Sequence, residues 1–122
     1  LQMASAVASL ANNGLWVTPH VIRNNPNVNM RQVFSPQTSE IMTRILVNSI
    51  SNNKESTVKL DGVPVAGKTG TSRKPNEDGK GYSTDLYTSF IGYYPANNPK
   101  ALVMVVVDSP KIAEAWGSTV AG

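Results

Sequence analysis

The residues best suited to chemistry lie together in one short stretch, Gly67-Lys68-Thr69-Gly70-Thr71. It offers one ammonium group, two hydroxyls that can donate hydrogen bonds, and a glycine that lets a ligand approach the backbone closely. The residues just before it, Val63-Pro64-Val65-Ala66, favour an extended chain because two of them are β-branched. Two chemical interpretations fit this pattern.

The first interpretation is a phosphate-binding loop. The range Gly62–Thr69 matches the pattern G-x-x-x-x-G-K-[ST], and Leu102–Asp108 is similar to the apolar strand ending in aspartate that holds magnesium in such proteins. A phosphate loop needs a helix that begins at its Lys-Thr pair, because the helix N-terminus binds the phosphate. Here Gly70 follows at once, and Pro75 and Gly79 oppose a helix. Nucleotide binding is therefore the less favoured alternative.

The second interpretation is a strand that holds a carboxylate. On a strand the side chains of Thr69 and Thr71 point to one face and that of Lys68 points to the other. Two hydroxyls and a nearby ammonium bind a carboxylate through charge-assisted hydrogen bonds, each contributing about 1.5–3 kcal/mol. Gly70 leaves room for an extended peptide beside the edge of a sheet. A strand end with ordinary surface residues is the remaining possibility.

Composition limits the kinds of site that the chain can build. Its 122 residues, 40% of them hydrophobic and 16% charged, suit one globular domain or part of one. The net charge of +3 comes from scattered basic residues, so we expect no nucleic-acid partner. Without cysteine and with His20 as the single histidine, we expect no metal site and no cofactor. His20 is expected to be half-buried and bonded to backbone.

The first half of the chain predicts two helices and two short strands. Apolar spacing predicts a helix over Leu1–Asn13, with Gly14 as its left-handed end. Ser35-Pro36 predicts the start of a second helix, with serine at the N-cap and proline at the first helical position. This helix should end near Asn52-Asn53. Its expected buried face, with the small Ser49 among the apolar residues, is Ile41, Met42, Ile45, Leu46 and Ile50. The short strands are expected at Leu15–Val17 and Arg31–Phe34.

The second half predicts three strands and the start of a helix. The strands are expected at Val63–Ser72, Leu86–Tyr94 and Ala101–Val107, with Arg73–Thr84 as a long polar hairpin loop. The third strand is apolar at every position, which is typical of a strand covered on both faces. Glu114–Ala121 is expected to begin a last helix. The predicted fold class is α+β, an antiparallel three-strand meander with packed helices.

The motif and its surroundings resemble a known family. Gly67-Lys68-Thr69-Gly70-Thr71 resembles the third active-site motif of the penicillin-binding transpeptidases and serine β-lactamases. Further phrases of the chain resemble the C-terminal half of a class B penicillin-binding protein, with a likeness to the division-type transpeptidases: Val17-Thr18-Pro19-His20, Ser35-Pro36, Ser89-Phe90-Ile91-Gly92-Tyr93-Tyr94-Pro95 and Trp116-Gly117-Ser118-Thr119-Val120-Ala121. The resemblance implies that residues 1–122 are the C-terminal part of a β-lactamase/transpeptidase-like domain, with its last helix cut short.

The resemblance also implies a reaction and a set of roles. In the family a serine attacks the D-Ala-D-Ala amide of a peptidoglycan stem peptide, and the amine of a second stem resolves the acyl-enzyme. By this resemblance Lys68 would hold the terminal carboxylate of the donor, and the hydroxyls of Thr69 and Thr71 would bind the same carboxylate or the equivalent group of a β-lactam. Gly70 would give clearance, and the backbone N–H of Thr71 would be one arm of the oxyanion hole.

Partners and location follow from the resemblance alone. It implies peptidoglycan stem peptides and β-lactams as ligands, with a glycosyltransferase and division proteins as partners of the longer protein. It places that protein at the extracytoplasmic face of the bacterial cell membrane, on an N-terminal anchor that lies outside this chain. A non-catalytic relative that keeps the fold for protein contacts is the alternative.

The nucleophile motif of the family, S-x-x-K, is expected upstream of Leu1. Two segments match it by chance, Ser51-Asn52-Asn53-Lys54 and Ser56-Thr57-Val58-Lys59. A nucleophile of this kind needs the buried start of a long helix, with its lysine one turn later. Ser51 falls at an expected helix end, and Asp61-Gly62-Val63-Pro64 prevents a helix from continuing after Ser56. We therefore expect no nucleophile in this chain and no transpeptidase activity from it alone.

Overall fold

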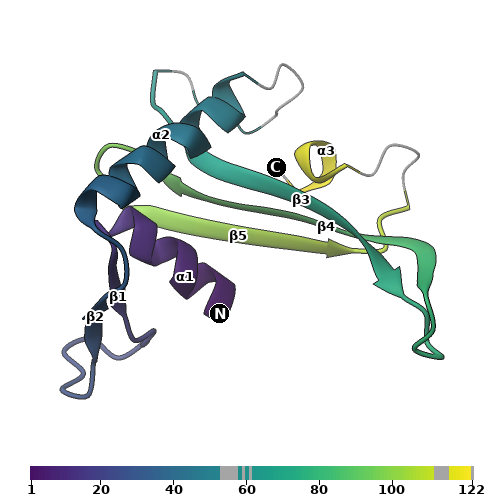
Figure 1. Cartoon of the computed structure of the whole chain (residues 1–122), viewed down its shortest axis with the longest axis horizontal. Helices are drawn as coiled ribbons and strands as arrows, with labels where there is room; N and C mark the ends of the chain where they lie inside the picture. Colours follow the sequence, from purple (N-terminus) through teal and green to yellow (C-terminus); the bar gives the residue numbers. More distant parts are fainter. Residues whose placement is uncertain (53–57, 59, 61, 112–115, 122) are drawn as a thin grey trace.

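The computed structural model describes residues 1–52, 58, 60, 62–111 and 116–121. It has the predicted α+β architecture (Figure 1). The elements in chain order are α1 (Gln2–Ala11), β1 (Leu15–Val17), β2 (Met30–Gln32), α2 (Pro36–Ser51), β3 (Ala66–Pro75), β4 (Tyr82–Tyr94), β5 (Ala101–Asp108) and α3 (Gly117–Val120). Among the described residues, no helix has the length and apolar character needed to cross a membrane.

The three long strands form an antiparallel sheet in the order β3-β4-β5. The register pairs Lys68 with Ile91 and, on the other side of β4, Ile91 with Met104. The predicted meander is therefore confirmed, with β3 and β5 as its edges. The two short strands β1 and β2 pair separately, and the second begins at Met30 instead of the predicted Arg31 and ends at Gln32 instead of Phe34.

The predicted boundaries of the first hairpin are wrong. β3 begins at Ala66 instead of Val63 and continues to Pro75, and β4 begins at Tyr82 instead of Leu86, so half of the expected loop over Arg73–Thr84 is strand. The hairpin is extended by two further cross-strand pairs, Arg73–Leu86 and Pro75–Tyr82. Only residues 76–81 remain as the connection between β3 and β4. The two strands can extend through these polar residues because their backbones pair with each other and an antiparallel sheet can expose one face to solvent.

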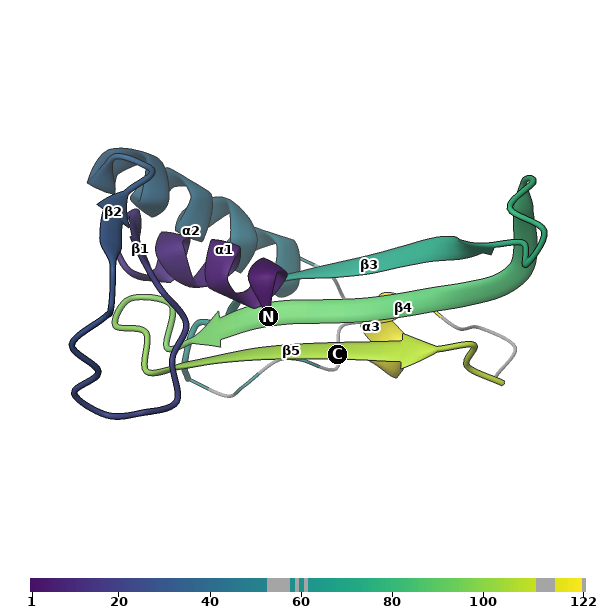
Figure 2. The same ribbon diagram turned by 90° about the horizontal axis from the view of Figure 1, so that it is seen from below.

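The sheet carries helices on both faces. One face packs a cluster around the buried Tyr93, 1% exposed, against α1 and α2; its further members are Ala66, Ala96, Val7, Ala11, Leu46, Val47 and Leu102. The other face packs Phe90 against Ala121, just after α3, together with Ile50, Val58 and Val107. Figure 2 shows α1 and α2 on one side of the sheet and α3 on the other.

The helix boundaries follow local capping chemistry. Ser35 caps α2 as predicted, because its Oγ accepts a hydrogen bond from the Thr38 N–H at 3.1 Å. At the end of α1 the first left-handed residue is Asn13, with φ of 52°, and Gly14 follows with φ of 82°. The Gly14 N–H donates to the Ser9 oxygen at 2.7 Å, as in a Schellman ending. The left-handed helix end predicted at Gly14 is therefore formed by Asn13 and Gly14 together.

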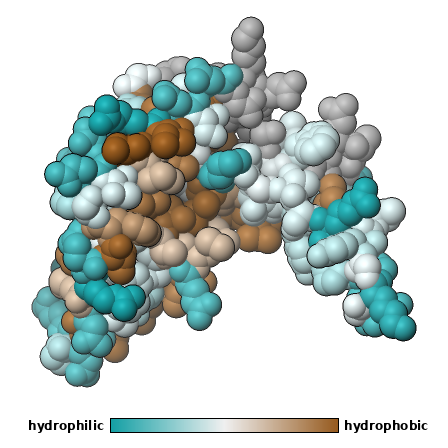
Figure 3. Space-filling model, viewed as in Figure 1, coloured by the Kyte–Doolittle hydropathy of each residue, from teal (hydrophilic) through white to brown (hydrophobic). Residues whose placement is uncertain are grey.

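The buried face of α2 differs from the prediction. Ile50 is buried as expected, but Ile41 and Ile45 are 53% and 54% exposed and Ser49 is exposed. The residue that is most buried is Ser39, at 1% exposure. Helical spacing allows two apolar stripes on this helix, and contact with the sheet selects the one through Leu46, Val47 and Ile50. Figure 3 shows apolar side chains exposed along α2.

The prediction for the third strand is also wrong. Its residues are not covered on both faces, since Val103 and Val106 are 55% and 53% exposed. β5 lies at the edge of the sheet, and the described helices pack mainly over β3 and β4. The last helix is a single turn that starts at Gly117, and Glu114, where it was expected to begin, lies outside the described residues.

Candidate active-site strand

The Lys-Thr-Gly-Thr motif lies in the middle of β3, at an edge of the sheet (Figure 1). Thr69 pairs with Phe90, and Thr71 pairs with Thr88. Among the described residues no strand pairs with the outer side of β3. Every second N–H and C=O of such a strand points away from its single neighbour and can bind an added chain.

Contacts around Gly70 and Thr69 show which backbone groups face outward. A Cβ added to Gly117 would lie 3.1 Å from the Gly70 nitrogen, 2.6 Å from the Gly70 oxygen and 2.9 Å from the Ser89 oxygen, so Gly117 packs over this cross-strand pair. The Thr69 oxygen accepts a hydrogen bond from the exposed Lys68 Nζ at 2.8 Å, which places this oxygen at the free edge of β3. Because these groups alternate along an antiparallel strand, Thr69 and Thr71 direct their N–H and C=O groups to the free edge.

The motif side chains divide between the two faces as predicted. Thr71 lies on the face that α3 covers, and its Oγ1 accepts a hydrogen bond from the Gly117 N–H at 3.1 Å. Alternation places Thr69 on the same face and Lys68 on the other. Lys68 is exposed, and its Nζ donates to the Thr69 oxygen at 2.8 Å. The ammonium therefore lies close to the free edge.

Two glycines explain how the strands approach each other beside the motif. A Cβ on Gly67 would lie 2.7 Å from the Phe90 ring, and a Cβ on its partner Gly92 would lie 2.6 Å from the same ring. The ring therefore packs directly on the backbone of both glycines. Gly67 thus has a packing role in β3. Around Gly70 the space is more open, because an added Cβ would have only the Ser89 Oγ within 4 Å, at 2.8 Å.

Trp116 is a residue near the site that reasoning from residue types missed. It is 62% exposed and immediately precedes Gly117, which packs on Gly70. An exposed aromatic ring therefore belongs to the segment that crosses the motif. The only signal in the sequence was its place in the phrase Trp116–Ala121, which resembles the family.

The phosphate-loop alternative is inconsistent with this geometry. Lys68 and Thr69 lie inside an extended strand that continues to Pro75, so no helix N-terminus is available for a phosphate. Asp108, the expected counterpart of a magnesium ligand, instead accepts a hydrogen bond from the Nζ of Lys74 at 2.6 Å.

The other candidate residues lie apart from the motif. Ser51 is exposed at the last position of α2, and Ser56 lies outside the described residues. His20 is exposed, which corrects the expected half-burial, and its Nδ1 lies 2.8 Å from the Thr18 oxygen, as the expected bond to backbone requires. Within the described ranges no three acidic, histidine or cysteine side chains come together as metal ligands.

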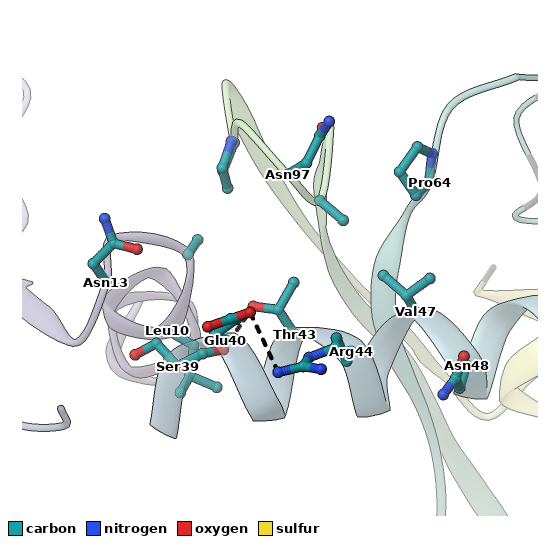
Figure 4. Close-up of a pocket in the computed structure, with 13 residues that line it drawn as sticks. Leu10, Asn13, Ser39, Glu40, Thr43, Arg44, Val47, Asn48, Pro64 and Asn97 are labelled. Atoms are coloured by element: carbon teal, nitrogen blue, oxygen red, sulfur yellow. Dashed lines mark hydrogen bonds and ion pairs between the residues drawn. The ribbon is translucent and has the colours of Figure 1, made fainter. Parts of the chain in front are cut away.

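A cavity of about 490 Å³ also lies away from the motif, between α1, α2 and the turn from β4 to β5 (Figure 4). Ser39, Thr43 and Asn97 line it, and Glu40 and Arg44 form an ion pair of 3.3 Å beside them. None of Lys68 to Thr71 contributes to this cavity. In the part of the chain that the structure describes, the motif therefore lies on an open strand edge, away from this cavity.

Comparison with known proteins agrees with this arrangement. The family model described as "Penicillin binding protein transpeptidase domain" matches residues 1–122. The chain belongs to this family. Among its relatives, a peptidoglycan D,D-transpeptidase FtsI homolog of Mesostigma viride is 34% identical over all of this chain and 24% of the relative. Stage V sporulation protein D of Bacillus subtilis is 31% identical, over 99% of this chain and 20% of the relative.

Solved transpeptidase structures share the fold. The transpeptidase domain of penicillin-binding protein 3 from Burkholderia pseudomallei superposes with a TM-score of 0.83 at 30% identity, covering 98% of this chain and 37% of that one. Penicillin-binding protein 3 from Mycobacterium tuberculosis, in complex with aztreonam, gives 0.81 at 25% identity, covering 89% and 28%. The chain thus spans only about a quarter of the length of the curated relatives that it matches.

Proposed function

We propose that this chain forms the substrate-holding edge of a serine D,D-transpeptidase that cross-links peptidoglycan stem peptides and binds penicillin. Residues 1–122 would be the C-terminal part of the transpeptidase domain. The observation that carries the proposal is the Thr69 oxygen at the free edge of β3, from which alternation along the strand directs the Thr71 backbone groups outward as well. An extended D-Ala-D-Ala terminus can pair with such an edge, as peptides do in strand addition.

The motif side chains complete a receptor for a terminal carboxylate. Lys68 supplies the positive charge near the free edge, and the hydroxyls of Thr69 and Thr71 lie together on the face that α3 covers. The Thr71 N–H would stabilise the oxyanion that forms when the serine attacks, an interaction typically worth about 10²–10³ in rate. No cofactor or metal is needed for this acyl transfer.

The nucleophile would come from another part of the longer protein. Ser51 is exposed at the end of α2 and not at the buried helix start that a nucleophile requires, and the sequence after Ser56, Asp61-Gly62-Val63-Pro64, opposes a long helix. The printed names of the relatives support a peptidoglycan substrate, and structures of the Mycobacterium tuberculosis relative with aztreonam and with ampicillin support β-lactam binding. The longer protein would act at the extracytoplasmic face of the membrane. Its partners would be a glycosyltransferase and division proteins.

Labelled penicillin tests the proposal on the complete protein that carries this chain. We expect one covalent adduct, mapped to a serine outside residues 1–122, and a strong slowing of acylation when Lys68 is replaced by alanine. The matched control is Lys80→Ala, a lysine in the connection between β3 and β4. An adduct on Ser51 or Ser56, or equal acylation of the two lysine variants, would contradict the proposal. Absence of any adduct would favour the non-catalytic relative.

A further inference from the structure

A lysine at the far end of β3 joins all three strands of the sheet. The Nζ of Lys74 crosses β4 at 5.0 Å from the ring centroid of Tyr87 and reaches Asp108, the last residue of β5. It donates to the Asp108 Oδ1 at 2.6 Å and to the Ser109 Oγ at 3.2 Å. We call Lys74, Tyr87, Asp108 and Ser109 the Lys74 cluster.

The members of the Lys74 cluster are arranged to bring the ammonium across the sheet. Tyr87 pairs with Ser72 on one side and with Asp108 on the other, so its ring lies under the path of the lysine. Ser109 has a left-handed φ of 49°, its N–H donates to the Leu86 oxygen at 2.9 Å, and its Oγ donates to Asp108 at 2.7 Å. Asp108 therefore accepts a hydrogen bond from Ser109 in addition to the one from Lys74.

The backbone at Lys74 departs from regular pairing. Between the pairs Arg73–Leu86 and Pro75–Tyr82 the register shifts, because Lys74 alone on β3 stands opposite residues 83–85 on β4. The extra residues therefore lie in β4, and such a bulge bends the strand that carries it and increases the local twist of the hairpin beside Lys74. The lysine side chain is only 26% exposed, compared with 57% for Asp108, so the ammonium lies partly under neighbouring groups. The ion pair is thus less screened by solvent at its Lys74 end than a pair between two fully exposed side chains.

The two charges also stabilise each other. The hydrogen bond from Lys74 lowers the pKa of Asp108, and the same bond raises the pKa of Lys74. Both groups therefore remain charged across the neutral pH range.

Lys74 lies three residues from Thr71 on β3, which has one hydrogen-bonded neighbour, β4, among the described residues. An edge strand is held on one side only, so its position depends strongly on further contacts along its length. Lys74 supplies such a contact, and it reaches past β4 to the opposite edge strand. Catalytic groups must be held to within about 0.5 Å for full effect.

We infer that Lys74 and Asp108 are positioning residues that hold β3 at the twist at which the Thr71 N–H points into the oxyanion site. This inference rests on the proposed function. Neither residue touches substrate; Lys74 acts through the backbone of Ser72 and Arg73, which join it to Thr71. Loss of the pair would slow formation of the acyl-enzyme more than it would weaken the initial binding of the β-lactam.

The test uses the complete protein and separates binding from acylation by stopped-flow measurement with a fluorescent penicillin. Lys74→Met removes the charge but keeps the length of the side chain, and Lys80→Met is the matched control. We expect Lys74→Met to lower the acylation rate constant about tenfold with a dissociation constant within about twofold of wild type, since a 1 Å misplacement can cost about 10² in rate. Lys74→Arg should recover most of the rate.

Asp108 provides the second variant. Asp108→Asn should slow acylation like Lys74→Met, and the double variant should be no slower than the worse single variant, because the two residues form one interaction. Equal rates for Lys74→Met and Lys80→Met, or losses that multiply in the double variant, would overturn the inference.

A measurement without activity separates this inference from the proposed function. Hydrogen exchange should show faster exchange of the Gly70 and Ser72 amides in Lys74→Met, by about tenfold, and no change in Lys80→Met, because weaker restraint allows more local opening. Should the wild-type protein form no acyl-enzyme, the proposed function fails, and the exchange result still decides the positioning role. Unchanged exchange in Lys74→Met would refute that role.

Discussion

The Gly117 N–H donates a hydrogen bond to the Oγ1 of Thr71 at 3.1 Å. This contact connects the first residue of α3 to the last residue of the motif, 46 positions earlier in the chain. Because the Thr71 oxygen accepts from Gly117, its own hydrogen remains available to donate to a ligand carboxylate. The C-terminal segment thus sets the direction of a hydroxyl that we assign to substrate binding.

Replacing Gly117 with alanine should displace α3 from β3. The added Cβ would lie 2.6 Å from the Gly70 oxygen and 2.9 Å from the Ser89 oxygen, and both are backbone atoms that cannot move aside easily. We expect the free energy of unfolding to fall by about 1–3 kcal/mol, as for overpacking elsewhere, and acylation by penicillin to slow. Chemical denaturation and stopped-flow acylation measure these effects.

The control for Gly117→Ala is Gly79→Ala, in the connection between β3 and β4. An added Cβ there has no atom within 4 Å, although the φ of +73° makes alanine unfavourable. Gly79→Ala should therefore lose some stability without slowing acylation. Normal acylation in Gly117→Ala would show that α3 does not orient Thr71.

Two substitutions at Thr71 separate its hydroxyl from its backbone. Thr71→Ala removes the hydroxyl and keeps the N–H, whereas Thr71→Pro removes the N–H that faces the free edge. Proline is tolerated on an edge strand when its missing N–H points to solvent. We expect Thr71→Pro to lower the acylation rate by about 10²–10³, the usual loss for one oxyanion donor, and Thr71→Ala to lower it less.

Arg73→Pro is the matched proline control, because Arg73 is two residues further along β3 and alternation directs its N–H to the same free edge. Melting temperatures of the three variants show whether the strand remains folded. A Thr71→Pro variant that is folded and acylates as fast as Arg73→Pro would remove the Thr71 N–H from the oxyanion hole.

The buried hydroxyl of Tyr93 should contribute to stability and not to acylation. Thr43 donates to the Ser39 oxygen at 2.8 Å, so its Oγ1 is free to accept from the Tyr93 hydroxyl at 2.6 Å. Tyr93→Phe should lower the free energy of unfolding by about 0.5–1.5 kcal/mol, the usual value of one hydrogen bond. The more exposed Tyr94→Phe is the control, and an equal loss in both variants would contradict the assignment.

The Tyr93 contribution should also depend on pH. Burial raises the pKa of Tyr93 above its ordinary value. The contribution is therefore fully present below about pH 10, the pKa of an unfolded tyrosine, and is lost as the pH rises through the raised pKa. Melting temperatures of wild type and Tyr93→Phe should converge in alkaline solution.

The Lys74–Asp108 pair should lose its stabilising effect in acid. Because the folded pKa of Asp108 is lowered by Lys74, its contribution is present above about pH 4, the pKa of an unfolded aspartate, and is lost as the pH falls through the lowered value. The difference in melting temperature between wild type and Asp108→Asn should be constant near neutral pH and shrink below about pH 4. A constant difference down to about pH 2 would contradict the prediction.

The local chemistry of the chain predicted several elements well. Ser35-Pro36 marked the start of α2 because both its capping hydroxyl and its missing N–H suit a helix N-terminus. Extended residues before Lys68 and a glycine directly after Thr69 were enough to make a phosphate loop the less favoured alternative. Alternation along the strand was enough to place Thr69 and Thr71 on one face. These features depend on neighbours in sequence, so the sequence determined them by itself.

Other features depend on contacts between distant residues, and only the tertiary structure decided them. Contact with the sheet chose which stripe of α2 is buried, and this left Ile41 and Ile45 exposed. Pairing with β4 extended β3 through Arg73 and Lys74, although these residues alone suggested a loop. Packing of Gly117 on Gly70 and the reach of Lys74 to Asp108 join segments more than 30 positions apart. No local pattern encodes such distances, because they are set by how the strands and helices pack around Tyr93 and Phe90.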